Sequence, residues 1–225
     1  MFIGSQLAES RACLPQTIDA YRRRTRFFFH LLMRFAEQVH GKRFLYVGVG
    51  RGEEILCAQQ EASDSTFVGL DVSLAFLKRT TTKLNLVLAD GRMLPFRDGS
   101  FNFVHCYHVL EHISDYRTCV GEMSRVLANR GTLYVATPNR RRLIGYMSSA
   151  QEFSLKGVIR RNVREWLARL TGSFSPEKGH HCGFFQEELQ TCLSNYFSRV
   201  MCVSKQYNIF VAYRTLYEPM VRIAL

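Results

Sequence analysis

The chain has 225 residues, of which 47% are hydrophobic, so it is long enough and apolar enough for one domain with a substantial core. Its net charge of +11 favours an anionic partner such as RNA, an acidic lipid surface or a phosphorylated small molecule, although a solubility bias explains the charge about as well. We find no transmembrane run, no basic-then-apolar leader and no C-x-x-C pair, which argues against membrane-spanning and secreted proteins and predicts a cytoplasmic protein with reduced thiols.

Residues 14–40 are predicted to form a helix, with arginines toward its start and the apolar run FFFHLLMRF, residues 27–35, toward its end. Because this helix precedes the first strand, we expect it to cover a ligand site. A basic helix that lies on a membrane is the alternative. The apolar run is more apolar all round than amphipathic, which favours the first interpretation.

Five apolar segments then alternate with helical ones. The predicted strands are Phe44–Val47, Thr66–Leu70, Leu84–Leu88, Phe101–Cys106 and Gly131–Ala136. The predicted helices are 51–61, 73–80 and 114–128. Such alternation implies right-handed crossovers and a parallel sheet covered on both faces by helices. Ligands of such sheets bind at the carboxyl ends of the strands, which carry Gly48, Asp71, Asp90, Tyr107 and Pro138.

Residues 143–180 interrupt this alternation. Apolar residues at near-helical spacing between Lys156 and Leu170, with arginines between them, predict a basic amphipathic helix. We expect this insertion to be a mobile lid over part of the acceptor site. A helix over 187–195 and two strands near 198–204 and 208–214 are predicted to follow.

The stretch from Phe44 to Ser73, FLYVGVGRGEEILCAQQEASDSTFVGLDVS, carries the clearest chemical signal. Glycines after a strand allow a tight turn and the close approach of a ligand, and the next helix offers its free N–H groups. Asp71 at the tip of the second strand can accept hydrogen bonds from both hydroxyls of a ribose. Together these features predict a site for an adenosine-containing cofactor. The glycine spacing is G-x-G-x-G, which differs from the dinucleotide-binding pattern G-x-G-x-x-G.

The G-x-G-x-G spacing resembles the first motif of class I S-adenosylmethionine-dependent methyltransferases. Further along, LADGRMLPFRDGSF, LEH and EMSRVLANRG are similar to motifs of the type-11 subgroup of that class. The resemblance covers about residues 42–140. It implies an α/β fold, a Rossmann-like seven-stranded, mostly parallel sheet with helices on both faces and an antiparallel last strand. It also implies S-adenosyl-L-methionine as the cofactor.

On this resemblance we expect a single methyltransferase domain over residues 1–225. Its parts would be a helical cap (1–40), a cofactor-binding core (41–142), a helical insertion or lid (143–183), and a C-terminal helix with the last strands (184–225).

The resemblance also implies roles for individual residues. The glycine loop would wrap the methionine part and ribose, Asp71 would hold the ribose hydroxyls, and Asp90 would accept from the adenine amino group beside Gly91 and Met93. Tyr107 and His108 would lie near the transferable methyl group. The complete cofactor-binding set is Gly48, Val49, Gly50, Gly52, Asp71, Val72, Asp90, Gly91, Met93 and Tyr107.

The sequence departs from the family pattern in three places. Tyr46 stands where an acidic residue usually helps to position the amino end of the cofactor, and Asn102 replaces a usual Asp. The triplet Asn129-Arg130-Gly131 replaces the usual Pro-Gly-Gly before the fifth strand. The first departure bears on cofactor affinity, whereas the other two are interpreted as structural drift.

His105, His108, Glu111 and His112 form a cluster whose H-x-x-E-H spacing permits a transition-metal site. The ordinary L-E-H of metal-free relatives is the favoured interpretation, so no metal is predicted. We take His108, Tyr107 and His181 as candidate catalytic residues, with His181 as a base or orienting donor. Two solvated loop histidines explain residues 180–181 equally well.

Arg140, Arg141 and Arg142 follow the fifth strand and can meet an anionic group of the substrate, although a solvated loop is the favoured interpretation. The sequence therefore predicts a methyltransferase that acts on a small or lipid-like acceptor. The alternatives are an RNA methyltransferase, suggested by the charge, and a catalytically silent partner subunit, suggested by Tyr46.

Overall fold

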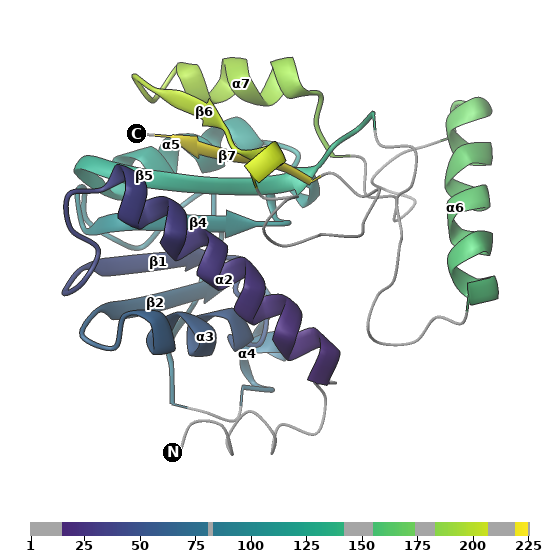
Figure 1. Cartoon of the computed structure of the whole chain (residues 1–225). Helices are drawn as coiled ribbons and strands as arrows, with labels where there is room; N and C mark the ends of the chain where they lie inside the picture. The colour runs from purple at the N-terminus through teal and green to yellow at the C-terminus, as the bar shows by residue number, and fades with distance from the viewer. Residues whose placement is uncertain (1–14, 81–82, 142–154, 174–182, 207–218, 225) are drawn as a thin grey trace.

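The computed structural model of the chain describes residues 15–80, 83–141, 155–173, 183–206 and 219–224. A seven-stranded sheet in the order β3-β2-β1-β4-β5-β7-β6 forms its centre (Figure 1). The strands are β1 (Arg43–Val47), β2 (Thr66–Asp71), β3 (Asn85–Leu88), β4 (Phe101–Tyr107), β5 (Leu127–Pro138), β6 (Val200–Cys202) and β7 (Pro219–Ala224).

The five strands from β3 to β5 pair in parallel, so their carboxyl ends meet at one edge of the sheet. This confirms the predicted parallel α/β arrangement over that part of the sheet. β7 pairs antiparallel with both β5 and β6. The strand expected near 198–204 is β6, whereas the one expected near 208–214 lies outside the described residues.

Helices cover both faces of the sheet. The described helices are α2 (Pro15–Phe35), α3 (Glu53–Glu61), α4 (Leu74–Leu77), the 3-10 turn η1 (Leu110–His112), α5 (Tyr116–Val126), α6 (Leu155–Leu170) and α7 (Gln186–Ser194). Of these, α6 stands apart from the sheet (Figure 1). α4 is shorter than the predicted 73–80, with Ser73 as its N-cap and Lys78 as its C-cap. The hydroxyl of Thr80 donates to the carbonyl oxygen of Arg51, at 3.0 Å.

β1 shows how the sheet separates two cores. Leu45 and Val47 pack on the face covered by α5 and α7, whereas Phe44 and Tyr46 pack on the face covered by α2 and α3. This is the period of two that a strand buried on both faces imposes. α2 runs across its face of the sheet (Figure 1), and Phe28 at its middle lies against the rings of His105 and Tyr134, with centroids 4.9 and 5.0 Å away. The apolar run of α2 is therefore part of the core.

α5 illustrates how local sequence sets a helix and its buried face. The side chain of Asp115 caps the start by accepting from the backbone N–H and the hydroxyl of Thr118, at 3.3 and 2.7 Å. Cys119, Val120, Met123 and Val126 follow at helical spacing and are all buried against the sheet.

The structure shows the surroundings of two of the departures from the family pattern. The side chain of Asn102 accepts a hydrogen bond from the backbone N–H of Arg43, at 3.0 Å, and so joins the starts of β1 and β4. Arg130 adopts a φ of 62°, the left-handed conformation that the usual glycine allows more easily. Both positions lie at the edge of the sheet opposite the carboxyl ends of the strands.

Candidate cofactor and active site

The loop after β1 has a backbone that glycine makes possible. Gly48 has a φ of 70° and Gly50 a φ of 58°. The backbone N–H groups of Gly48 and Val49 both donate to the carbonyl oxygen of Leu70 in β2, at 2.9 and 3.0 Å. A Cβ at Gly48 would collide with Val109, whereas a Cβ at Gly50 would meet open space. The loop is thus packed on one side and open to a ligand on the other.

Asp71 fixes this loop at the end of β2. Its carboxylate accepts from the backbone N–H groups of Gly50 and Ser73, both at 2.8 Å, and its side chain is mostly buried. A carboxylate oxygen has more than one acceptor direction, so these bonds leave capacity for a ligand hydroxyl. The geometry of Asp71 fits the predicted ribose contact, which stays a prediction.

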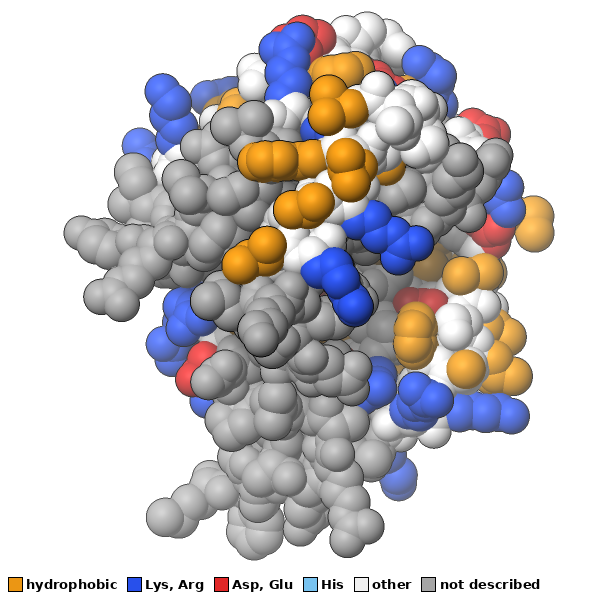
Figure 2. All heavy atoms as spheres, turned by 90° about the vertical axis from the view of Figure 1, so that its right-hand side faces the viewer, with side chains coloured by type: hydrophobic (Ala, Val, Ile, Leu, Met, Phe, Trp, Pro, Cys, Tyr) orange, Lys and Arg blue, Asp and Glu red, His pale blue; other side chains and the backbone are white. Residues whose placement is uncertain are grey.

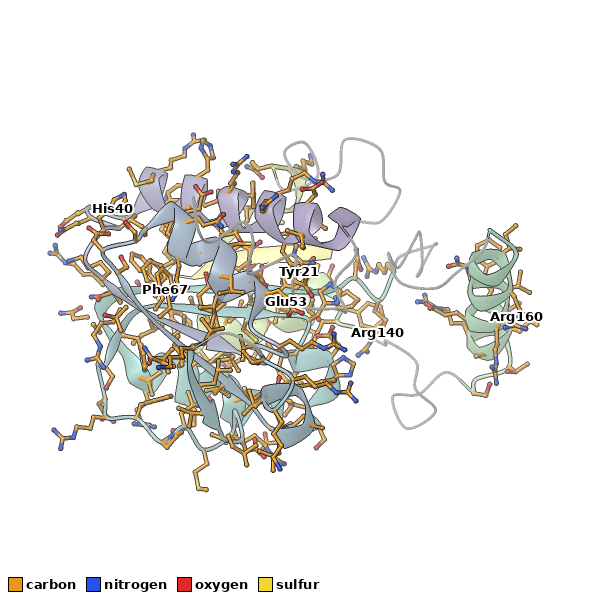
Figure 3. All side chains as sticks on the ribbon, turned by 90° about the horizontal axis from the view of Figure 1, so that it is seen from below. Tyr21, His40, Glu53, Phe67, Arg140 and Arg160 are labelled. Carbon is orange, nitrogen blue, oxygen red and sulfur yellow. The ribbon has the colours of Figure 1, made fainter. Side chains whose placement is uncertain are left out.

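A cavity of about 560 Å³ opens beside the glycine loop at the carboxyl ends of β1 and β4, within the usual size range of small-molecule sites. Its lining combines predicted site residues with residues of α2 and α3. They are Tyr21, Arg24, Gly48, Val49, Gly50, Arg51, Glu53, Glu54, Phe76, Tyr107 and His108. Figure 3 shows Tyr21 of α2 next to Glu53 of α3 at this end of the molecule.

Arg24 and Glu54 are cavity residues that the sequence reasoning missed. The guanidinium of Arg24 lies 4.3 Å from the ring centre of Tyr107 and 4.6 Å from that of Tyr21. Its Nε lies 3.6 Å from Oε1 of Glu54, and this oxygen is buried with no hydrogen-bond partner among the described residues. Two features of the sequence could have indicated them. Glu54 lies in the first turn of the helix after the glycine loop, and Arg24 belongs to the arginine run before the first strand.

Tyr107 ends β4, His108 follows it, and both line the cavity, whereas their predicted place near the transferable methyl group stays a prediction. His108 has a φ of 55°, a backbone conformation that residues other than glycine rarely adopt. Its Nδ1 lies 3.2 Å from Oε1 of buried Glu111, whose Oε2 accepts from the hydroxyl of Thr137 at 3.0 Å. Such unusual backbone persists where neighbours hold it, often at functional sites.

The histidine cluster of the sequence divides in space. His105 is buried between aromatic rings and stacks on Tyr134 at 5.0 Å, whereas His108 faces the cavity and His112 is exposed. Across the described ranges we find no three His, Cys, Asp or Glu side chains placed to hold a metal ion.

The expected adenine side of the site is more open. Asp90 forms a two-pronged ion pair with Arg92, with oxygen–nitrogen distances of 2.6 to 3.1 Å, so a contact to adenine has to share that carboxylate. Val72 and Met93 expose 73% and 77% of their surface, although both are apolar. A Cβ at Gly91 would meet Cys119. These two exposed apolar side chains beside the strand ends could pack against the flat adenine ring.

The arginines after β5 are engaged with the chain itself. Arg140 donates to the carbonyl oxygen of Gly183 at 2.9 Å and lies 3.7 Å from Glu188, and Arg141 lies 3.6 Å from Glu187. The sequence favoured a solvated loop here, and an anionic group of the substrate would have to compete with Gly183 and α7 for these side chains. Arg142 and the candidate base His181 lie outside the described residues.

Buried His105 should make the stability of the fold depend on pH. Burial lowers the pKa of His105 from 6.5 to about 4, although the negative charge of Glu54 acts to raise it. Between these values the unfolded chain binds more protons than the folded one, so the free energy of unfolding should fall by about 3 kcal/mol as pH drops from 6.5 to 4. The free energy of unfolding is measured by denaturant titration at several pH values across this range. In His105→Phe it should depend less steeply on pH than in the unmodified protein. Equal slopes in the two proteins would contradict this assignment.

The glycine loop, the acidic end of β2 and the cavity at the carboxyl edge together form the kind of site that Rossmann-like domains use to bind a cofactor. Residues 45–135 match the family model described as a methyltransferase domain, of the type-11 subgroup. This segment is a class I methyltransferase domain of that subgroup, and the cofactor of the class is S-adenosyl-L-methionine.

The chain is also similar to the following relatives and solved structure. An uncharacterised protein of Methanocaldococcus jannaschii is 32% identical over 130 residues, which cover 52% of this chain and 56% of that protein. A demethylmenaquinone methyltransferase of Thermus thermophilus is 34% identical over 101 residues, 42% of this chain and 46% of that protein. The chain thus spans about half the length of these curated relatives. A methyltransferase structure from Mesorhizobium loti shares the fold, with a TM-score of 0.55 at 18% identity over 88% of this chain and 96% of that one.

Proposed function

We propose that the protein transfers a methyl group from S-adenosylmethionine to a small or lipid-like acceptor. The observation that carries this proposal is the cavity beside the glycine loop, with Asp71 bonded to Gly50 on one side and Tyr107 and His108 on the other. S-Adenosylmethionine supplies an electrophilic methyl group on a sulfonium, and the leaving thioether needs no proton. The protein then has to align and desolvate the acceptor, which accounts for most of such a rate.

The residues present fit the methionine end of this cofactor. That end carries an ammonium and a carboxylate, and the cavity offers the carboxylate of Glu54 and the guanidinium of Arg24. Glu54 sits in the first turn of α3, and its buried Oε1 has acceptor capacity left. We therefore propose that Glu54 takes over the role of the acid that Tyr46 replaces, with Arg24 of α2 holding the carboxylate.

The same proposal assigns roles around the transferable methyl group. Tyr107 and His108 would orient the acceptor, because both line the cavity at the end of β4 and His108 is held by Glu111. The lid formed by 143–183, and His181 within it as a base or orienting donor, complete the proposed acceptor site. We also propose that β7, inserted antiparallel between β5 and β6, closes a seven-stranded sheet of the methyltransferase type.

Methyl transfer from labelled S-adenosylmethionine tests this function. The protein is incubated with methyl-labelled cofactor and a cell extract, which is then separated into lipid, small-molecule, RNA and protein fractions. We expect label in the lipid or small-molecule fraction, and less transfer by an Asp71→Ala variant when the cofactor is limiting. Label confined to RNA would favour the alternative suggested by the net charge of +11, and label in no fraction would favour a silent subunit.

We expect this transfer to proceed without a metal ion. His108 stands where the metal-dependent pattern has an acid, and it contacts Glu111 instead of joining a ligand set with His105. Dialysis against a chelator should leave the transfer rate unchanged. A rate that vanishes with the chelator and returns with magnesium or zinc would show that a metal takes part.

A further inference from the structure

α6 turns its apolar side outward. Five apolar side chains of this helix expose between 47% and 84% of their surface: Ile159, Val163, Trp166, Leu167 and Leu170. At about 100° per residue they fall within an arc of about 100°, so they form one continuous stripe. Isolated exposed apolar residues are common on proteins, but a continuous stripe marks a surface that binds something.

The inward side of α6 is held by polar contacts. Glu165 and Ala168 are buried, and Arg169 donates to Oε1 of Glu165 at 2.6 Å. Arg169 also donates to the carbonyl oxygen of Arg140 at 2.8 Å, which ties the end of α6 to the chain just after β5. These contacts fix which face of the helix points away from the sheet.

Basic side chains border the apolar stripe. Figure 2 looks at α6 from outside and shows apolar side chains gathered along the helix with Lys or Arg side chains next to them. Arg160 and Arg164 are both exposed, and Glu165, the acidic residue of α6, lies inward. The whole chain carries a net charge of +11. An apolar stripe with a basic border is the pattern of helices that lie in a membrane interface.

The position of α6 connects this surface with the cavity. The helix stands off the edge of the sheet where the parallel strands end (Figure 1), and the cavity opens at the same edge. None of the described helices is long and apolar enough to cross a bilayer. The exposed apolar stripe of α6, its basic border and its place at the edge with the cavity are the features of a helix that rests on a bilayer surface.

We propose that α6 docks the protein on an anionic lipid bilayer, with its apolar stripe among the acyl chains and Arg160 and Arg164 at the phosphates. RNA would satisfy the arginines but leave the apolar stripe in water. A second copy would cover the stripe but bring like charges together. An anionic bilayer satisfies both features. Docking does not depend on methyl transfer, although under the proposed function it would bring lipid-embedded acceptors to the cavity.

Trp166 is the only tryptophan of the chain, so its fluorescence reports directly on this surface. The protein is titrated with vesicles of phosphatidylcholine, either pure or mixed with equal parts of phosphatidylglycerol. We expect a blue shift of the emission and co-sedimentation with the mixed vesicles, with affinity for pure phosphatidylcholine lower by about tenfold or more. No shift and no sedimentation with the anionic vesicles would overturn the proposal.

Two variants separate the stripe from general charge. Leu167→Glu with Leu170→Glu, both at exposed positions, should weaken vesicle binding by about tenfold or more and leave the thermal midpoint unchanged. Arg160→Glu with Arg164→Glu should weaken it similarly. The matched control is Arg97→Glu with Arg199→Glu, which makes the same charge change at exposed positions on the opposite edge of the sheet. An equal loss of vesicle binding in the control would mean that only the net charge of the protein matters, and would overturn the proposal.

The remaining outcomes identify another occupant of α6. Bulk RNA that shifts Trp166 emission and displaces the vesicles would assign the surface to nucleic acid. A lower mass of the Leu167→Glu, Leu170→Glu variant in sedimentation without vesicles would assign it to a second copy. Either result overturns the membrane proposal. S-Adenosylhomocysteine binding in solution is measured in parallel, so failure of docking is distinguishable from failure of the proposed function.

Discussion

Replacing Asp71 with Ala is expected to weaken binding of S-adenosylhomocysteine by about 1–3 kcal/mol, or roughly 5- to 150-fold in the dissociation constant. The carboxylate does two jobs at once. It holds the glycine loop through the N–H of Gly50, at 2.8 Å, and we expect it also to accept from the ribose hydroxyls. Isothermal titration calorimetry of the two proteins measures the difference.

The control for this change is Asp64→Ala, which removes a carboxylate at an exposed position that pairs with His40. This variant should bind the cofactor product as the unmodified protein does. Circular dichroism and thermal unfolding show whether Asp71→Ala keeps its fold. A folded Asp71→Ala variant with unchanged affinity would mean that the cofactor does not bind beside β2.

Replacing Glu54 with Gln is expected to weaken binding by about 1.5–3 kcal/mol, because a charge-assisted bond to the cofactor ammonium is lost. The change is nearly isosteric but removes the charge that faces Arg24 at 3.6 Å, so thermal unfolding of the variant is measured beside its affinity. Arg24→Ala should act in the same direction through the cofactor carboxylate. The matched control is Glu61→Gln at the far end of α3, where the carboxylate pairs with Arg26 at the surface.

A truncated ligand makes this prediction specific. 5′-Methylthioadenosine lacks the ammonium and the carboxylate, so Glu54→Gln and Arg24→Ala should leave its affinity unchanged. Asp71→Ala should weaken both ligands, because both contain the ribose. A loss of methylthioadenosine binding in Glu54→Gln equal to the loss for S-adenosylhomocysteine would show that Glu54 acts through the shape of the cavity and not through the ammonium.

The sequence predicted the parallel core because its signals are local. Apolar segments of strand length, glycines with positive φ such as Gly48 and Gly50, and an acid after β2 each leave a pattern within a few residues. The carboxyl ends of parallel strands must meet at one edge, so the convergence of Asp71 and Tyr107 followed from topology alone.

The missed features depend on contacts between distant segments. Arg24 and Glu54 are thirty positions apart, and only the packing of α2 on the sheet brings them to one cavity. Nor does the sequence show that Arg140 is engaged by Gly183, or that the stripe of α6 faces outward. An amphipathic pattern gives the existence of an apolar face but not its direction, which the contacts of Arg169 decide.

Calorimetric titration of the unmodified protein with S-adenosylhomocysteine tests the central claim most directly. The cavity between the glycine loop, Glu54 and Tyr107 predicts saturable binding at one site per chain, weakened in Asp71→Ala and in Glu54→Gln but not in Glu61→Gln. Absence of binding by the folded protein at millimolar ligand would contradict the assignment of this crevice to S-adenosylmethionine and, with it, the proposed methyl transfer.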